Sequence, residues 1–124
     1  RSFINIVIEV STLLKPIDLM KILLKIEQDL ERERKNKNDP RTCDIDIIDY
    51  KNESMNLKLE ELQLKIPHVS MKERDFVLLP LKEICPYWSH PLTKEPIDHL
   101  INNLKGKNNN ITKLSQSYII NYVE

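Results

Sequence analysis

Glycine is almost absent from this chain, since Gly106 is the only one among 124 residues. Loops that wrap phosphate groups with backbone amides need several glycines at fixed spacing, so glycine-rich phosphate loops are excluded. A phosphate ligand would therefore have to be held by side chains. The formal net charge is zero, and this balance gives no reason to expect a nucleic-acid-binding surface.

Cysteines and long apolar runs are scarce as well. Cys43 and Cys85 are the only two cysteines, and their spacing fits no metal or redox motif. No apolar run approaches the roughly 18 residues that span a membrane, and no signal-peptide pattern is visible. We therefore expect a cytoplasmic protein with no membrane interaction. The chain starts at Arg1, directly in an apolar run, and we expect it to be the remainder of a longer protein.

Two aspartates in an apolar stretch, Asp44 and Asp46 within residues 40–48 (PRTCDIDII), are the most informative feature. A strand here would point both carboxylates to one face, about 7 Å apart, and the intervening isoleucines to the other. Paired carboxylates repel each other unless a cation lies between them. Magnesium binds one or two carboxylates together with water and phosphate oxygens, and Arg41 suits a phosphate group. The stretch predicts a magnesium and phosphate site, while spacing alone leaves a solvated surface strand as the alternative.

Hydrophobic periodicity in the first third predicts a strand and then a helix. Residues 3–10 are rich in β-branched side chains and predict a strand, in which Asn5 is either a structural bridge or a ligand-reading amide. Pro16 suits the first turn of a helix over residues 16–33. Glu27 is expected beside the buried face of this helix, on a solvated flank. That face is predicted to consist of Leu19, Ile22, Leu23, Ile26 and Leu30.

The remaining two thirds predict short elements joined by turns. Residues 31–41 form a charged loop with an excess of two bases, which is either simply solvated or a phosphate-handling lid. Residues 55–59 predict a returning strand or an extended segment, and residues 63–68 an extended segment. Residues 71–74 predict a helical turn, residues 76–79 a buried apolar run, residues 80–86 a turn of helix between prolines, and residues 95–104 a short helix. Trp88 is expected to be a packing anchor, and residues 105–124 a linker or C-terminal extension.

The order of these features resembles one enzyme family. Residues 26–34 read IEQDLERER, residues 40–47 read PRTCDIDI, residues 66–68 read IPH, and residues 74–84 read RDFVLLPLKEI. Together they resemble 6-hydroxymethyl-7,8-dihydropterin pyrophosphokinases, which are ATP-dependent enzymes of folate biosynthesis. The resemblance runs from Phe3 to about Pro91. It implies an α+β fold, a ferredoxin-like α/β sandwich with a mainly antiparallel sheet, here N-terminally truncated, with residues 1–104 as the pyrophosphokinase domain.

The resemblance also implies a role for each matched residue. Asp44 and Asp46 would hold two magnesium ions that bridge the phosphates of ATP. The catalytic side chains would be Arg32, Arg34, Lys35 and Arg41. The ATP-binding residues would be His68, Arg74, Arg41, Ile47 and Lys65. The pterin-binding residues would be Asn5, Phe3 and Phe76. Glu27 matches a motif position for which the resemblance supplies no role.

The chain also departs from the family pattern, and these departures leave alternatives open. The family's first strand with its Gly-Ser-Asn signature, the following helix and the second strand have no counterpart here. Asn38, Asp39 and Val69 replace a usual tryptophan, glycine and tyrosine. The alternatives to an active transferase are a catalytically inactive fragment and a small nucleotide- or nucleic-acid-binding module. The tail could lead into dihydropteroate synthase, to which this family is often fused.

Overall fold

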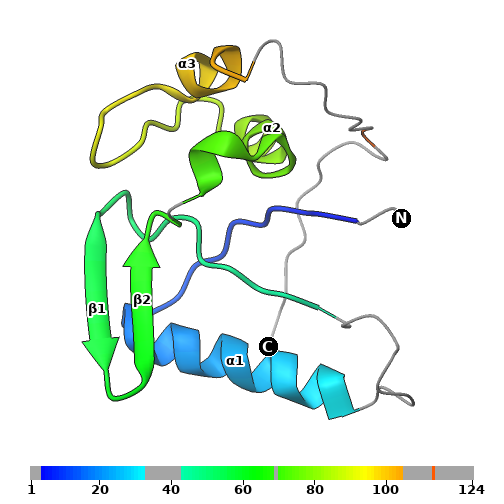
Figure 1. Ribbon diagram of the computed structural model, residues 1–124, viewed down its shortest axis with the longest axis vertical. Helices are drawn as coiled ribbons and strands as arrows, with labels where there is room; N and C mark the ends of the chain where they lie inside the picture. Colours follow the sequence, from blue (N-terminus) through cyan, green and yellow to red (C-terminus); the bar gives the residue numbers. More distant parts are fainter. Residues whose placement is uncertain (1–3, 33–42, 69, 105–112, 114–124) are drawn as a thin grey trace. The chain divides into compact units, whose positions relative to one another are not determined.

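The computed structural model describes residues 4–32, 43–68, 70–104 and 113. The chain divides into two compact units, Arg1–Val10 with Ser70–Glu124 and Ser11–Val69, which we describe separately. The described residues form three α-helices, one short 3-10 helix and a two-stranded antiparallel sheet (Figure 1). The fold is therefore α+β, as the sequence predicts. No helix among the described residues has the length and apolar character needed to cross a membrane.

In the unit Ser11–Val69, helix α1 (Pro16–Arg32) precedes a β-hairpin. Strands β1 (Met55–Leu59) and β2 (Leu62–Ile66) pair antiparallel, with Leu57 opposite Leu64. Side chains of β2 alternate between exposed and covered, which places Leu64 and Ile66 in the core. The predicted helix and returning strand are confirmed, because proline at a first turn and alternation of period two are strong local signals.

The covered face of α1 differs from the predicted one. Ile22 and Ile26 are exposed, and no residue of α1 is fully buried. The other three predicted residues, Leu19, Leu23 and Leu30, are half-buried as predicted. Met20, Leu24, Glu27 and Glu31 are half-buried as well. The prediction of Glu27 as a solvated flank is therefore wrong, because its side chain is partly covered.

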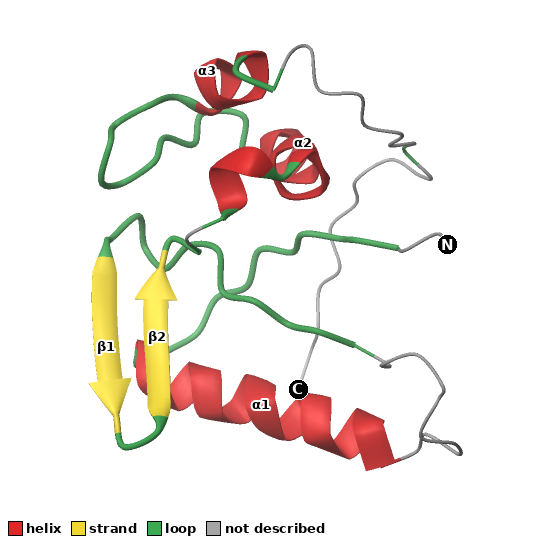
Figure 2. Ribbon diagram, viewed as in Figure 1, coloured by secondary structure: helices red, strands yellow, loops and turns green. Residues whose placement is uncertain are grey.

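The strand predicted around Asp44 and Asp46 is not observed in its described part. Residues 43–49 form an extended segment without ladder pairing, drawn as loop (Figure 2). Alternating side chains favour an extended backbone, but a strand also needs a hydrogen-bonded neighbour. A turn follows in which Lys51 and Asn52 adopt positive φ values of 54° and 56°. Asn52 is a residue type that tolerates this left-handed region, and its N–H donates to Asp49 Oδ2 at 3.1 Å. The turn directs the chain into β1.

In the other unit, a short 3-10 helix η1 (Met71–Glu73) leads into α2 (Asp75–Ile84), and α3 (Ile97–Asn102) packs against α2. The two separate segments predicted over residues 76–86 are wrong, because Pro80 lies inside one continuous helix. Proline in a helix interior costs about 3 kcal/mol. Burial of Leu78 and Leu81 on one face, three residues apart, offsets that cost.

The core of this unit is formed by seven apolar side chains. It contains Met71, Leu78, Leu81, Trp88, Ile97, Leu100 and Leu104. Trp88 is buried, as predicted for a packing anchor. Helix α3 is shorter than predicted because Pro96 has an extended backbone and precedes its first turn, while Leu104 lies in the turn that follows the helix.

The predicted strand over residues 3–10 is not observed in its described part, residues 4–10. Ile4, Ile6, Ile8 and Val10 are 62–79 % exposed. β-Branched side chains favour an extended backbone, but a strand also needs a hydrogen-bonded neighbour. No described strand pairs with this segment, which accounts for the wrong prediction.

Candidate functional site

Asp44 and Asp46 lie on the same side of the extended segment. Both side chains are exposed, whereas Cys43, Ile45 and Ile47 between and beside them are half-buried. This alternation is that of a strand whose apolar face is covered. The two carboxylates therefore share the solvent-facing side, which is the arrangement that the sequence predicts for the metal pair.

This carboxylate pair suits magnesium only together with a ligand that supplies further oxygens. Among the described residues, no group of three or more His, Cys, Asp or Glu side chains could hold a metal ion by itself. Magnesium usually keeps several waters and binds through one or two carboxylates plus substrate phosphates. Asp44 and Asp46 therefore fit a metal ion that arrives with a nucleotide, and they do not form a complete protein cage.

Two hydrogen bonds hold the aspartate segment along α1. The Ile45 N–H donates to Glu27 Oε2 at 2.5 Å, and the Tyr50 hydroxyl donates to the Leu14 carbonyl at 2.5 Å. The segment is thus tied to Glu27 within α1 and to Leu14, which precedes that helix. Figure 1 shows the extended segment and α1 in this unit. The sequence assigns no role to Glu27, although the residue belongs to the IEQDLERER motif. The structure shows that its side chain contacts the aspartate segment.

Arg32 ends helix α1 just before the charged loop. Its guanidinium Nη1 lies 3.5 Å from Asp29 Oδ1, and Lys25 Nζ lies 3.0 Å from the same oxygen. The Arg32 side chain is 73 % exposed, so this ion pair contributes little to stability and can exchange for a phosphate oxygen. The other predicted catalytic residues, Arg34, Lys35 and Arg41, lie outside the described residues.

Three predicted ATP-binding residues lie in the same unit as the aspartates. Lys65 is exposed on β2 opposite Asn56, and Ile47 is half-buried on the covered side of the aspartate segment. His68 is half-buried and follows Pro67, which is joined to Ile66 by a cis peptide bond. Lys65 thus lies on β2, His68 just after it, and Ile47 on the extended segment.

Arg74 and Phe76 come together in the unit that contains α2. Arg74 precedes the helix, and its carbonyl accepts the N–H groups of Val77 and Leu78, each at 3.0 Å. The Arg74 guanidinium lies over the Phe76 ring, which is 36 % exposed. An exposed ring with a cation on one face can take a flat aromatic ligand by stacking.

The other two predicted pterin-binding residues are Asn5 and Phe3. Asn5 is exposed in the unpaired segment 4–10, so the alternative in which its amide is a structural bridge within a strand is not observed. An unpaired segment leaves the side chain in solvent, where an amide needs no internal partner. Phe3 lies outside the described residues.

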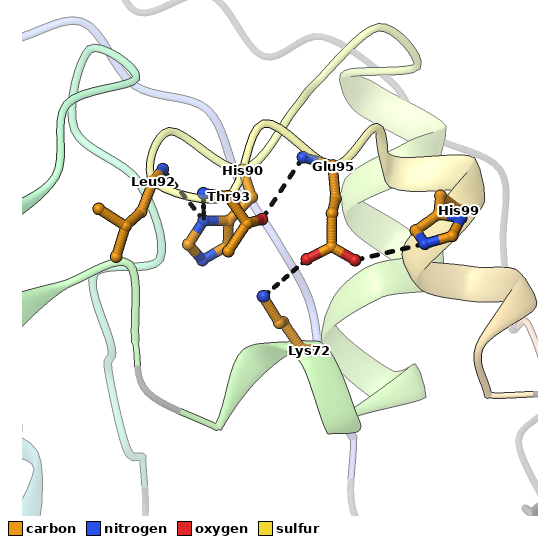
Figure 3. Close-up of polar contacts among 6 residues, drawn as sticks. All are labelled: Lys72, His90, Leu92, Thr93, Glu95 and His99. Atoms are coloured by element: carbon orange, nitrogen blue, oxygen red, sulfur yellow. Dashed lines mark hydrogen bonds and ion pairs between the residues drawn. The ribbon is translucent and has the colours of Figure 1, made fainter.

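A polar cluster, defined by Lys72, Glu95, His99 and His90, was not found by sequence analysis (Figure 3). Glu95 Oε1 lies 2.7 Å from Lys72 Nζ, and Glu95 Oε2 lies 3.4 Å from His99 Nε2. The hydrogen bond from Lys72 lowers the pKa of Glu95, with a smaller contribution from Thr93. No local pattern could have revealed this contact, because Lys72 and Glu95 are 23 residues apart.

His90 fixes the loop before α3. Its ring is 7 % exposed, and its Nδ1 atom accepts the N–H groups of Leu92 and Thr93, each at 3.2 Å. Because Nδ1 accepts hydrogen bonds, the proton of the neutral ring lies on Nε2. Trp88 packs edge-on against the ring at 6.0 Å. These contacts make the polar cluster a structural support for α2 and α3.

Comparison with known proteins identifies the family of this chain. The family model described as 7,8-dihydro-6-hydroxymethylpterin-pyrophosphokinase matches residues 1–86. "Folic acid synthesis protein FOL1" of Dictyostelium discoideum is 49 % identical over 90 residues, which are 73 % of this chain and 13 % of that protein. The 2-amino-4-hydroxy-6-hydroxymethyldihydropteridine pyrophosphokinase of Aquifex aeolicus is 38 % identical over 77 % of this chain and 58 % of that protein.

A third relative agrees with these two. The 2-amino-4-hydroxy-6-hydroxymethyldihydropteridine pyrophosphokinase of Synechocystis is 41 % identical over 80 % of this chain and 49 % of that enzyme. The chain thus spans about half the length of the Aquifex and Synechocystis enzymes. By the family match and these similarities, the chain belongs to the 7,8-dihydro-6-hydroxymethylpterin-pyrophosphokinase family.

Proposed function

We propose that the protein transfers the terminal diphosphate of ATP to 6-hydroxymethyl-7,8-dihydropterin, which yields AMP and the pterin diphosphate in folate biosynthesis. Family membership and the similarity to two named pyrophosphokinases support this reaction. The single structural observation that carries it is the shared exposed face of Asp44 and Asp46. These carboxylates are the ligands that a magnesium–nucleotide complex requires.

The reaction forms one phosphorus–oxygen bond and breaks another. The hydroxymethyl oxygen of the pterin attacks the β-phosphorus of ATP, the bond from that phosphorus to the oxygen retained by AMP breaks, and the alcohol proton is released. Such a transfer depends on in-line positioning and on stabilisation of phosphate charge. Asp44 and Asp46 would hold bound magnesium, proposed as two ions, which would supply that charge stabilisation.

The protein's own residues would position the two substrates. Asp44 and Asp46 would hold the metal–nucleotide complex, while Lys65, His68, Arg74 and the backbone at Ile47 would contact ATP. The cations Arg32, Arg34, Lys35 and Arg41 would stabilise charge on the leaving AMP and the transferred group.

The pterin would be recognised by its ring. Phe76 and Phe3 would stack on the pterin, and the Asn5 amide would read its edge. The exposure of Phe76 and Asn5 supports this assignment, since both side chains are accessible to a ligand.

Domain extent and context are proposed with the activity. We assign residues 1–104 to the pyrophosphokinase domain, because α3 and Leu104 pack in one core with α2 beyond residue 86, where the family match ends. Residues 105–124 are proposed as a linker or extension. Fusion to dihydropteroate synthase and a cytoplasmic location are proposed too. The matched region covers only 13 % of the Dictyostelium protein, as expected when the similar region is one domain of a larger chain.

AMP release tests this function. The chain is incubated with ATP, magnesium and 6-hydroxymethyl-7,8-dihydropterin, and AMP and pterin diphosphate are quantified by chromatography. We expect equal amounts of both products, and none when the pterin or magnesium is left out. Tight binding of magnesium–ATP without AMP release would instead support a catalytically inactive binding domain. That second candidate is favoured by the unpaired, exposed state of residues 4–10, which carry Asn5.

A further inference from the structure

Glu27 is a partly covered acidic residue of α1 that contacts the candidate metal site. Its Oε2 atom accepts the N–H of Ile45, the residue between Asp44 and Asp46. Asp29, another acidic residue of α1, pairs with Lys25 and Arg32 on the exposed side. Glu27 therefore acts on the backbone between the two aspartates.

The Ile45 bond fixes the direction of both aspartate side chains. In an extended chain, neighbouring side chains point to opposite faces, so one anchored peptide sets the faces of the residues on either side. The half-buried Ile45 side chain and the exposed Asp44 and Asp46 agree with one fixed orientation. Without the Glu27 acceptor, this segment has no ladder partner among the described residues to hold its register.

A second bond holds the far end of the segment. The Tyr50 hydroxyl donates to the Leu14 carbonyl, which lies just before α1. A slip of the segment by one residue would move the Ile45 amide away from Glu27 and turn the aspartates to the covered side.

Glu27 itself is not placed as a metal ligand. The described residues contain no group of three acidic, histidine or cysteine side chains suited to a metal ion, so Glu27 does not join Asp44 and Asp46 in such a group. Its carboxylate oxygen is used by a backbone amide, and a hydrogen bond to an ionised acceptor is the stronger kind. Its action on the metal site runs through Ile45.

We propose that Glu27 is a positioning residue for magnesium–nucleotide binding, which holds Asp44 and Asp46 on one face through its hydrogen bond to the Ile45 amide. This inference rests on the proposed function. Metal binding would then depend on a residue that is not itself a metal ligand. The side chain at position 27 must place an acceptor oxygen at the right distance from the Ile45 amide, but that acceptor does not need a charge.

The test compares three substitutions at Glu27 in the full chain with Gln28→Ala, an exposed neighbour on the same helix. Glu27→Gln keeps an acceptor of the same reach without charge, Glu27→Asp keeps the charge but is one methylene shorter, and Glu27→Ala removes both. Calorimetry measures the affinity for a non-hydrolysable ATP analogue with and without magnesium. NMR follows the proton shift and hydrogen exchange of the Ile45 amide.

We expect Glu27→Ala and Glu27→Asp to weaken magnesium-dependent binding at least about tenfold and to accelerate exchange of the Ile45 amide. Glu27→Gln should remain within about threefold of the unsubstituted chain, as should Gln28→Ala, and binding without magnesium should be the same in all. Should Glu27→Ala fail to fold, the contrast between Glu27→Gln and Glu27→Asp decides. Wild-type affinity in Glu27→Asp, or a loss in Glu27→Gln as large as in Glu27→Asp, overturns the proposal.

The same titration separates this inference from the proposed function. If Asp44→Asn and Asp46→Asn bind magnesium–nucleotide as tightly as the unsubstituted chain, the metal site and the positioning role both fail. If those variants lose affinity while every Glu27 variant keeps it, only the positioning role fails.

Discussion

The Arg74 guanidinium carbon lies 5.6 Å from the centre of the Phe76 ring. Arg74 immediately precedes α2, and Phe76 lies in its first turn. The two residues are proposed to contact different substrates, the phosphates of ATP and the pterin ring. A cation over an aromatic face is attracted by the ring quadrupole.

The first prediction concerns this pair. In a double-mutant cycle of Arg74→Gln and Phe76→Leu, we expect a coupling of about 0.5–1 kcal/mol in the free energy of unfolding, as for an exposed cation–ring contact. Urea unfolding of the single and double variants gives this coupling. Strictly additive effects would show that the contact does not contribute. Phe76→Leu should also weaken pterin binding more than nucleotide binding.

The second prediction concerns the dependence of stability on pH. The bond from Lys72 lowers the pKa of Glu95 in the folded protein, so the native state binds a proton there less readily than the unfolded chain. The stabilisation from ionised Glu95 is therefore complete above its ordinary pKa of 4.5 and is lost as the pH falls through the lowered native value. We expect Glu95→Gln to be less stable than the unsubstituted chain at neutral pH and to converge with it in acid.

Urea unfolding at a series of pH values measures this difference. Glu73→Gln is the control, because Glu73 is exposed on η1 beside Lys72. A gap between the unsubstituted chain and Glu95→Gln that stays constant into acid would contradict the role of the Lys72 bond.

The third prediction concerns the loop before α3. In His90→Ala the Nδ1 acceptor is lost, and the N–H groups of Leu92 and Thr93 are left without it. Leu92 and Thr93 are exposed, so water can take the place of the lost acceptor in part, and removal of the buried His90 ring adds a packing loss. We expect a loss of stability of about 1 kcal/mol, the net contribution of a typical hydrogen bond. We also expect a red shift of the fluorescence of Trp88, whose ring lies against His90. An unchanged emission maximum together with unchanged stability would show that the ring does not order this loop.

Local signals in the sequence predict the elements that close their hydrogen bonds within a short segment. Helix α1 and strand β1 are of this kind, since Pro16 and the period-two alternation of residues 55–59 need no distant partner. Residues 4–10 fail as a strand because strand formation depends on a neighbour. Helix α2 continues through Pro80 because Leu78 and Leu81 are buried. The low helix propensity of proline alone does not include this packing energy.

The candidate site divides in the same way. The common face of Asp44 and Asp46 follows from spacing alone, because a segment of extended chain alternates its side chains. The Glu27 contact does not, because it joins residues 18 positions apart and depends on how the segment lies along α1. The Lys72–Glu95 pair is hidden for the same reason.

The proposed function depends most directly on the two aspartates as ligands of a magnesium–nucleotide complex. Calorimetric titration of a non-hydrolysable ATP analogue, with and without magnesium, tests this for Asp44→Asn and Asp46→Asn. Asp49→Asn is the control on the same segment, because Asp49 contacts the Asn52 amide in the following turn. We predict that each of the two substitutions weakens magnesium-dependent binding at least about tenfold, or 1.4 kcal/mol, while the control keeps it. Equal affinity in all of these proteins would contradict the account.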